Sequence, residues 1–478
     1  MINFKKYGKR CLSLFLAASM ILMPAVQIFA EEETAAATTD STQTAEEDRE
    51  TQRQNCYAIV PDSNSVENWP QGPATYADSA IVMDMNSGAV LYSKQIEKKH
   101  YPASITKLLT TLVALDNAEL TDTVEFSQDS ISFLEYGDAH IGMTPGEQIS
   151  MEDALYAVLL ASANEVSYAV AESVGKKMGG GYDTFIQAMN DESEKLGCTG
   201  SHWTNANGLH DEQHYTTAHD MARIGAAVYQ KEAFRTISQS LSHTIPVTNL
   251  VNEERTFQQK HKMLWPQNDN YYEYCKGGKT GYTDQARTTL VTMADNGDMQ
   301  LVAVVLYDFG NDAYIDTRAM FDYAYSNFSK ISLKDQKLPE GVKSYEDEDA
   351  YIVLPKSAQF SDVKAEVKED SNKDGSGTVT FTYKGQEVGS VKAAIEKTEE
   401  SSAAVLGKKK DKTTSTVVTG ISKFMKIVIG VVIAVVILLI IIVVLANYRK
   451  QIRRRRRKKG KRRNAKSGNV KRKKKRRR

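Results

Sequence analysis

The segment Tyr101-Pro-Ala-Ser-Ile-Thr-Lys-Leu-Leu-Thr-Thr-Leu112 decides how this chain folds and which chemistry it can support. Its apolar residues recur at the spacing of one face of an α-helix, so we expect a buried helix that begins after Pro102. Ser104 then lies in the first turn, and Lys107 lies on the same face three residues later. The segment therefore predicts a serine hydroxyl beside a lysine amine. The apolar residues are Ile105, Leu108, Leu109, Leu112, Val113 and Leu115.

Two more short motifs follow along the chain. Ser162-Ala-Asn164 lies in a second helical pattern, over about residues 151–177, and supplies a hydroxyl and an amide. Lys279-Thr-Gly281 follows two glycines and fits the edge of a strand, because glycines leave room for a peptide backbone to lie against it. Its lysine and threonine offer a charge and a hydroxyl to a carboxylate. The motifs together predict a cleft for a peptide that ends in a free carboxylate.

Each motif also has a simpler interpretation. Ser104 and Lys107 could be a serine at a helix start and a solvated lysine, and Ser162-Ala-Asn164 could be a polar turn inside a helix. The Ser-x-x-Lys pattern recurs at 173–176 and 361–364, whereas Lys-Thr-Gly occurs once. The prediction therefore depends on the order and setting of the motifs rather than on any single match.

Lys107 is the candidate base. A serine hydroxyl is a poor nucleophile unless a base takes its proton during attack, and the sequence has no Gly-x-Ser-x-Gly nucleophile elbow. An ammonium in a tight site beside another cation has a lowered pKa, so Lys107 can be neutral if Lys279 lies near it. At a helix start, the backbone N–H of Ser104 also points into the cleft and can form half of an oxyanion hole.

The pattern of elements predicts an α/β (α+β) fold, with helices packed on an antiparallel sheet. Strand-like runs flank Asn86-Ser-Gly88 and Asn296-Gly297, which predicts one early and one late hairpin that pair near each other. Helices are expected over about 182–196, 217–229 and 315–325, the second opened by Thr217 with Asp220 three residues on. Short β-like runs over about 346–393 predict a small all-β module without a catalytic constellation.

The chain resembles the serine-type D-alanyl-D-alanine carboxypeptidases, the low-molecular-mass penicillin-binding proteins of peptidase family S11. The resemblance covers about residues 76–328 and extends more loosely to 393. It implies a β-lactamase/transpeptidase-like domain, followed by the small all-β domain. The segments that carry it, besides the three motifs, are Pro102-Ala-Ser-Ile-Thr-Lys107, Asn205-Ala-Asn-Gly-Leu209, His214-Tyr-Thr-Thr-Ala218 and Gly278-Lys-Thr-Gly-Tyr-Thr283.

The resemblance also implies roles for individual residues. Ser104 would be acylated, with Lys107 as its base and Ser162 as a proton relay. Asn164 would bind the substrate amide, and the backbone N–H groups of Ser104 and Tyr282 would form the oxyanion hole. Lys279 and Thr280 would hold the terminal carboxylate. The expected substrate-binding residues are Asn164, Lys279, Thr280, Gly281, Tyr282 and Thr283.

The implied reaction removes the terminal D-alanine from a peptidoglycan stem pentapeptide. It would proceed through an acyl-enzyme that water hydrolyses, and β-lactam antibiotics would trap the same serine. The chain departs from the family where Ala163, Glu165 and Val166 replace its usual glycine, aspartate and alanine, and where Arg287 follows Ala286. These departures leave the catalytic residue types in place.

Both ends of the chain carry targeting patterns. Residues 1–30 read as a signal peptide, with a basic start and an apolar run before Ala30, and 31–68 read as a disordered leader. The catalytic domain is expected over 69–332, the β-rich domain over 340–396 and a linker over 397–426. Residues 427–446 form an uninterrupted apolar run, long enough for one C-terminal transmembrane helix. The polybasic tail 447–478 would then be cytoplasmic and the catalytic domain extracytoplasmic.

The charge is divided between the ends and the body. Arg449 to Arg478 hold 21 Lys or Arg and no acid, and the first ten residues hold four more cations. Without these 25 cations the net charge of +1 becomes −24 over Cys11 to Tyr448. The tail is therefore expected to contact anionic membrane lipids. Nucleic-acid binding is not supported, because the tail has no aromatic residue beyond Tyr448 for stacking on bases.

No cofactor or metal is expected. After removal of the signal peptide, Cys56, Cys198 and Cys275 remain, an odd and sparse set that argues against a disulfide framework. His210 and His214 have the spacing of a metal pair, but Asp211 stands where a zinc peptidase needs glutamate. We expect these histidines to lie in a loop near the active site.

Two other functions fit part of the sequence. A β-lactamase could use the same nucleophile and base, but the sequence has no convincing Glu-x-x-Leu-Asn segment for the deacylating glutamate of the class A enzymes. A non-catalytic, membrane-anchored protein that binds the cell wall would instead make the basic tail the functional part. A long-lived penicillin adduct, rather than rapid hydrolysis of the penicillin, would favour the peptidase over the β-lactamase.

Overall fold

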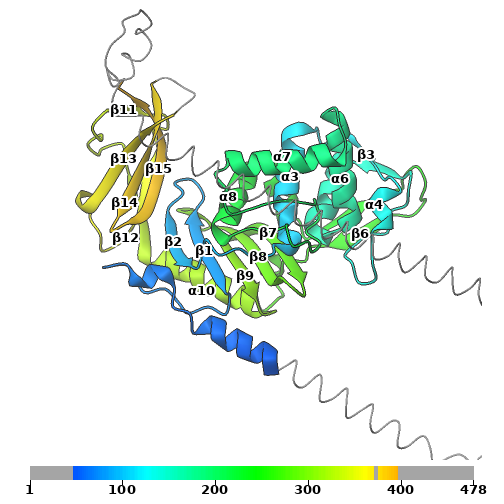
Figure 1. Cartoon of the computed structure of the whole chain (residues 1–478), viewed down its shortest axis with the longest axis horizontal. Helices are drawn as coiled ribbons and strands as arrows, with labels where there is room; N and C mark the ends of the chain where they lie inside the picture. The colour runs from blue at the N-terminus through cyan, green and yellow to red at the C-terminus, as the bar shows by residue number, and fades with distance from the viewer. Residues whose placement is uncertain (1–46, 371–374, 397–478) are drawn as a thin grey trace, which may run out of the picture. The chain divides into compact units, whose positions relative to one another are not determined.

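The late hairpin forms the centre of a five-stranded antiparallel sheet in the order β2-β1-β9-β8-β7. The computed structural model describes residues 47–370 and 375–396 (Figure 1). Strand β1 pairs with β9 from Ser79 opposite Leu306 to Asp84 opposite Leu301, so the early and late hairpins join as expected. The strands are β1 (Ser79–Asp84), β2 (Val90–Lys94), β7 (Cys275–Thr283), β8 (Arg287–Asp295) and β9 (Gln300–Asp308).

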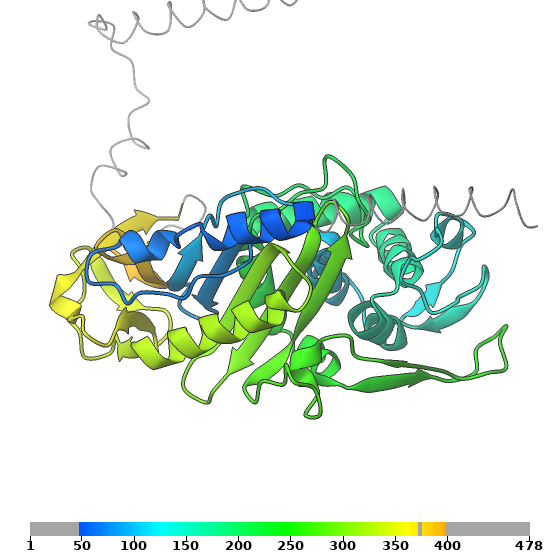
Figure 2. The same cartoon turned by 90° about the horizontal axis from the view of Figure 1, so that it is seen from below.

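The central strands are buried on both faces of the sheet. On β9, Val302, Val304 and Leu306 face one hydrophobic core, while Leu301, Ala303 and Val305 face another, because successive side chains of a strand point to opposite faces. The first core includes α3 (Lys107–Asn117) and α8 (Ala218–Tyr229), and the second includes α10 (Asp312–Asn327). Figure 2 shows α10 running across its face of the sheet. The predicted α+β arrangement of an antiparallel sheet with packed helices is confirmed.

Further helices and small hairpins follow α3 along the chain. The helical pattern over 151–177 is divided into α5 (Met151–Tyr156), a π-helix (Ala157–Ala161) and α6 (Asn164–Lys177). Thr217 caps α8 by accepting a hydrogen bond from the backbone N–H of Asp220 at 3.1 Å, as its sequence predicts. The other elements here are β3 (Thr123–Glu125), α4 (Asp129–Ser132), β4 (Gln148–Ser150), α7 (Tyr182–Lys195), α9 (Glu232–Gln239), β5 (Ser242–Ile245) and β6 (Arg255–Gln258).

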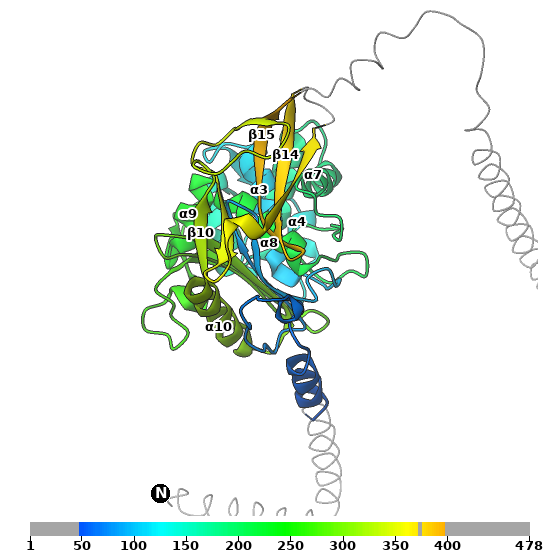
Figure 3. The ribbon, with the colours of Figure 1, turned by 90° about the vertical axis from the view of Figure 1, so that its left-hand side faces the viewer.

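A separate set of strands follows α10. β11 (Val342–Tyr345), β15 (Gln386–Ile395), β14 (Ser376–Tyr383) and β13 (Val363–Glu369) form a four-stranded sheet in that order, and β10 (Phe328–Ser332) pairs with β12 (Tyr351–Pro355) (Figure 3). Phe381 of this sheet belongs to the same hydrophobic core as Trp69 and α10. The β-rich module is therefore packed onto the catalytic part rather than held by a linker.

The segment expected to be a disordered leader is ordered where the structure describes it. Residues 47–57 form a helix, the turn η1 covers Asp62–Ser65, and Trp69 is buried with its ring 5.1 Å from that of Phe328. Arg53 stacks on Tyr76 and forms an ion pair with Asp312 at the start of α10. The prediction of disorder from composition was wrong here because a few long-range contacts, rather than local apolar content, stabilise the structure of this segment.

Several predicted segments lie outside the described residues. These are the signal peptide, the first part of the leader, the linker, the apolar run 427–446 and the basic tail. Within 47–370 and 375–396, none of the helices combines the length and apolarity needed to cross a bilayer. The transmembrane prediction for 427–446 stays a prediction.

Candidate active site

Ser104 and Lys107 meet where a tight turn becomes helix α3. Ser104 lies in the 3₁₀ turn η2 (Ala103–Thr106), and Lys107 is the first residue of α3. The Lys107 Nζ lies 3.0 Å from Ser104 Oγ, 2.8 Å from Asn164 Oδ1 and 2.6 Å from the backbone oxygen of Asn207. A neutral amine can donate its two protons to the latter pair and turn its lone pair to the Ser104 hydroxyl. The contact therefore suits a base and its nucleophile.

The electrostatics of the site favour neutral lysines. Lys107 is fully buried, and its burial, with help from the cation of Lys260, lowers its pKa to about 7. Burial also holds the pKa of Lys279 well below its ordinary value, and the charges of Lys107 and Lys260 act in the same direction. Desolvation disfavours an ammonium because it removes the water that stabilises the charge. The expected lowering of the Lys107 pKa is thus present, but its causes are burial and the cation of Lys260 rather than that of Lys279.

Ser162 and Asn164 reach the site because the helical pattern breaks between them. The π-helix ends at Ala161, the next residue, Ser162, has left-handed backbone angles of φ 61° and ψ 31°, and α6 begins at Asn164. Lys279 Nζ donates to Ser162 Oγ at 3.0 Å, while Asn164 Oδ1 accepts from Lys107. A strained residue of this kind persists only where surrounding contacts hold it, and such residues gather at functional sites. Each of the two side chains thus has one lysine partner: Ser162 bonds to Lys279 and Asn164 to Lys107.

Strand β7 forms the other wall. Gly281 packs so tightly that a Cβ there would lie 2.9 Å from the backbone nitrogen of Ser104 and 2.4 Å from Thr289 Oγ1. No larger residue fits, so the glycine allows the strand to reach the nucleophile. Thr280 precedes it on the same strand and is partly exposed.

The last two predicted residues of β7 differ from the others. The side chain of Tyr282 is 55% exposed and does not join the lysine cluster. Thr283 accepts a hydrogen bond at 3.0 Å from the backbone N–H of Ala286, so its hydroxyl holds the turn into β8. The structure thus gives two hydrogen-bonded sets, one of Ser104, Lys107 and Asn164 and one of Ser162 and Lys279, and it packs Gly281 against the backbone nitrogen of Ser104.

Sequence reasoning gave no role to three residues at this site. Asn207 supplies a carbonyl to Lys107, and Gly208, at φ 84°, lies where a Cβ would be 1.9 Å from the oxygen of Ala103. Lys260, on the loop after β6, adds the third cation. The Asn-Gly pair was a detectable signal because it commonly adopts positive φ. Lys260 lies in no motif, so only the fold could reveal it.

The predicted histidine loop lies beside the nucleophile turn. His214 is buried and bonded to Thr106 Oγ1 at 2.8 Å, while the ring of His210 packs edge-on against Tyr101 at 4.6 Å. The two histidines thus have separate partners. In the part of the chain that the structure describes, no group of three or more His, Cys, Asp or Glu residues could hold a metal ion.

A rim loop, residues 133–147, borders the Ser162 side of the cleft. The backbone N–H of Asn164 donates to the oxygen of Ala139 at 2.8 Å, and the N–H of Ile141 donates to Glu165 Oε1 at 2.7 Å. Burial raises the pKa of Glu165. The residue next to Asn164 therefore ties the rim loop to the second motif.

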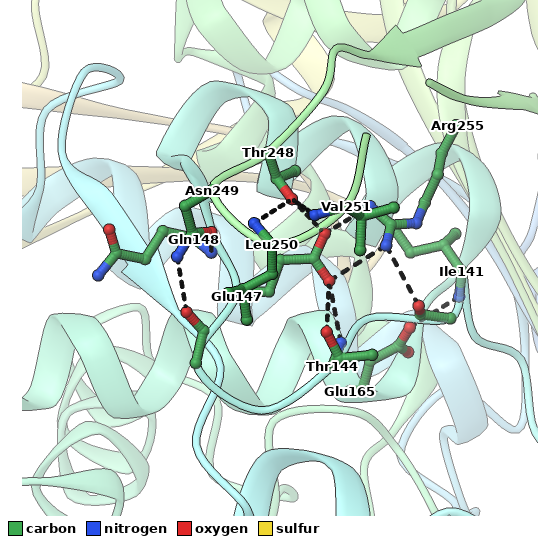
Figure 4. A network of polar contacts seen from close by, with 12 residues as sticks. Ile141, Thr144, Glu147, Gln148, Glu165, Thr248, Asn249, Leu250, Val251 and Arg255 are labelled. Atoms are coloured by element: carbon green, nitrogen blue, oxygen red, sulfur yellow. Dashed lines mark hydrogen bonds and ion pairs between the residues drawn. The ribbon is translucent and has the colours of Figure 1, made fainter. Parts of the chain in front are cut away.

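The far end of the rim loop is held by a buried ion pair. Figure 4 shows Glu147 between Thr144, Thr248 and Arg255. Arg255 donates to both carboxylate oxygens, at 2.6 and 3.1 Å, and Thr248 Oγ1 donates at 2.8 Å. Burial would raise the pKa of Glu147, but its bonds to Arg255, Thr248 and Thr144 outweigh it and hold the pKa below its ordinary value. The rim loop is thus linked to the β5–β6 hairpin.

Comparison with known proteins gives consistent matches over this region. The family model for peptidase S11, described as D-alanyl-D-alanine carboxypeptidase, matches residues 66–310. The chain is 28% identical over 340 residues to D-alanyl-D-alanine carboxypeptidase DacF of Bacillus subtilis, covering 66% of this chain and 80% of that one. It is 31% identical over 267 residues to D-alanyl-D-alanine carboxypeptidase DacB2 of Mycobacterium tuberculosis, covering 54% and 84%.

A solved structure is also similar. The crystal structure of a D-alanyl-D-alanine carboxypeptidase from Mycobacterium tuberculosis H37Rv has 31% sequence identity and a TM-score of 0.48. The match covers 56% of this chain and 96% of that chain. Every predicted site residue, from Ser104 to Thr283, lies within the region matched by the family model.

We predict that replacing Arg255 by methionine lowers the free energy of unfolding by about 3–5 kcal/mol, because it leaves the buried Glu147 carboxylate unpaired. Glu147→Gln/Arg255→Met should recover part of this loss, since neither charge then remains. Denaturant unfolding of the wild type, both single variants and the double variant measures the coupling. Additive losses in the double variant would contradict a coupling between Glu147 and Arg255.

The same ion pair makes stability depend on pH. Because the Glu147 pKa is lowered on folding, the stabilisation from Glu147 is complete above the pKa of this carboxyl in the unfolded chain and disappears as the pH falls through its pKa in the folded protein.

Proposed function

This chain belongs to the peptidase S11 family of D-alanyl-D-alanine carboxypeptidases, and we propose that it removes the terminal D-alanine of peptidoglycan stem pentapeptides through an acyl-enzyme on Ser104. It is accordingly a serine-type peptidase of the penicillin-binding class. The observation that carries the proposed mechanism is the 3.0 Å contact between Ser104 Oγ and the fully buried Lys107 Nζ, whose pKa is lowered to about 7. A base that titrates near neutral pH is well matched to proton transfer.

Acylation forms the Ser104 Oγ–carbon bond and breaks the peptide bond. Lys107 takes the hydroxyl proton as Ser104 attacks the penultimate carbonyl. Ser162 Oγ accepts a hydrogen bond from Lys279, which leaves its own hydroxyl proton free to pass to the departing D-alanine amine. The proton that Lys107 took from Ser104 would then replace it on Ser162, so that Lys107 is neutral again. The negative charge that develops on the carbonyl oxygen would be stabilised by the backbone N–H groups of Ser104 and Tyr282.

Binding and deacylation use the same groups. The terminal carboxylate would lie near Lys279 and Thr280, where its charge would favour the protonated form of Lys279. Asn164 would hold the substrate amide from the opposite wall. Water then adds to the ester carbonyl, its hydroxyl stays on the shortened peptide, and a proton returns to Ser104. β-Lactams would acylate the same serine and so inhibit the enzyme.

We predict that Ser104→Ala abolishes labelling by a fluorescent penicillin and lowers D-alanine release from a D-Ala-D-Ala pentapeptide by about 10³-fold or more, because the nucleophile is lost. Gel fluorescence and a D-alanine assay measure the two effects. Ser173→Ala, in an unrelated Ser-x-x-Lys match, is the control and should behave as wild type. Unchanged labelling in Ser104→Ala would refute the mechanism, and rapid hydrolysis of the penicillin by wild-type protein would favour the β-lactamase alternative.

We predict that the acylation rate of wild-type protein is about 100-fold lower at pH 5 than on its plateau, because Lys107, with a pKa of about 7, must be neutral to act as base. Lys260→Gln should move the midpoint to higher pH, since it removes a cation that disfavours protonation of Lys107. Stopped-flow penicillin acylation over pH 5–9 measures both midpoints. A downward shift in Lys260→Gln would contradict the assigned electrostatics.

We further propose that residues 427–446 anchor the protein, with the domains 69–332 and 340–396 outside the membrane and the tail 447–478 in the cytoplasm. The support is the apolar run and the cluster of cations after it. Deletion of 453–478 should leave the carboxypeptidase activity of detergent-solubilised protein unchanged, because lipid contact is the tail's proposed role. Loss of turnover in that variant would argue for a catalytic role instead.

A further inference from the structure

The residue before the nucleophile has an unfavourable backbone conformation. Ala103 has φ 50° and is buried. Alanine rarely adopts positive φ because its Cβ crowds the following carbonyl, so neighbouring contacts must hold this conformation. Two contacts meet at its carbonyl oxygen. Thr106 Oγ1 donates to it at 2.8 Å, and Gly208 lies so close that a Cβ would be 1.9 Å away.

The Thr106 hydroxyl belongs to a hydrogen-bond chain with only one possible direction. The backbone N–H of Thr204 donates to His214 Nδ1 at 3.0 Å, so this nitrogen must be an acceptor. His214 Nε2 then carries the proton and donates to Thr106 Oγ1 at 2.8 Å. The single hydroxyl proton of Thr106 is left for the oxygen of Ala103.

The surroundings favour the neutral histidine that this chain needs. His214 is 1% exposed and Thr106 is fully buried, and the His214 ring packs edge-on against Trp203 at 5.4 Å. Burial lowers the pKa of His214 to about 3. A protonated ring would place a second N–H against the Thr204 N–H, so the geometry and the burial agree.

The bond to Ala103 also sets the direction of the Ser104 N–H. The peptide that joins Ala103 to Ser104 is trans and planar, so its C=O and N–H point in opposite directions. A hydrogen bond that holds the Ala103 oxygen in place therefore also sets the direction of the Ser104 N–H, on the other side of the peptide. The Ser104 nitrogen lies between two glycines: a Cβ on Gly281 would be 2.9 Å from it, and one on Gly208 would be 3.0 Å from it. The Ser104 N–H thus lies where the turn Ala103–Thr106 packs against Gly281 of β7.

We propose that His214 and Thr106 are positioning residues that aim the Ser104 N–H at the oxygen of the tetrahedral intermediate. The inference rests on the proposed acyl-enzyme function, because it needs an oxyanion at that place. Neither residue touches the substrate. The two residues act through the rigid peptide group between Ala103 and Ser104, whose N–H they orient. This orientation matters most in the transition state, where negative charge develops on the carbonyl oxygen.

The test compares Thr106→Val with Thr106→Ser in the full-length protein. Valine keeps the shape of threonine but loses the hydroxyl, whereas serine keeps the hydroxyl. Thr106→Val should lower kcat for D-alanine release and the rate of penicillin acylation by about 10-fold or more with little change in KM, since misdirection weakens an oxyanion donor. Thr106→Ser should stay within about threefold of wild type, as the hydroxyl carries the effect.

The outcomes separate this inference from the proposed function. Wild-type protein that neither binds penicillin nor releases D-alanine would refute the function itself. Wild-type activity with an equally active Thr106→Val would refute only the positioning role. An equal loss in Thr106→Ser would assign the effect to packing of the methyl group and would also overturn it.

A second measurement is made on the wild-type protein itself. Nitrogen NMR of the histidine-labelled wild-type protein, with His214 assigned through His214→Gln, reports which ring nitrogen carries the proton. We expect a single neutral form with the proton on Nε2 across pH 5–9. A proton on Nδ1, or a mixture of the two forms, would contradict the direction of the chain and overturn the proposal.

Discussion

The desolvated amine of Lys107 is the constraint on which the site depends. Its Nζ contacts the nucleophile, the Asn164 amide and the Asn207 carbonyl within 3.0 Å, and these three partners come from three segments far apart in sequence. A buried lysine is tolerated only where its protons find acceptors or its charge is lost. Here both conditions hold, so the contacts that satisfy the amine also assemble the cleft. Any shift of α6 or of the loop at Asn207 would leave this group unsatisfied.

Close backbone packing makes that arrangement possible. Gly281 and Gly208 both approach the peptide between Ala103 and Ser104, at distances that a side chain would block. Two residues with left-handed φ belong to the site: Ala103 directly precedes Ser104, and Ser162 is itself the second serine. Such strain is stable only because α3, α8 and the central strands form a buried core beneath it. The scaffold therefore stabilises a conformation that the local sequence disfavours.

Much of the fold was predictable from local pattern. The turns at Asn86-Ser-Gly88 and Asn296-Gly297 predicted the two hairpins, and Thr217 predicted the start of α8. The prediction of a disordered leader was wrong over residues 47–68. The order of this segment comes from the ring contact of the adjoining Trp69 and from the ion pair between Arg53 and Asp312, which composition does not reveal. The cation of Lys260 and the carbonyl of Asn207 were missed for the same reason: their effect depends on position in space rather than on a motif.

The sequence by itself determined the residue types of the reaction, their order and the family, because those depend on chemistry and on spacing along the chain. It predicted Ser104 and Lys107 in the first turn of one helix; in the structure Ser104 lies in the 3₁₀ turn that leads into α3, and Lys107 is the first residue of α3. Only the tertiary structure decided that Asn164 bonds to Lys107, that Lys279 bonds to Ser162 and that burial brings the pKa of Lys107 to about 7. Those properties depend on distance and on the exclusion of water, and both arise when segments 57 and 117 residues apart pack together.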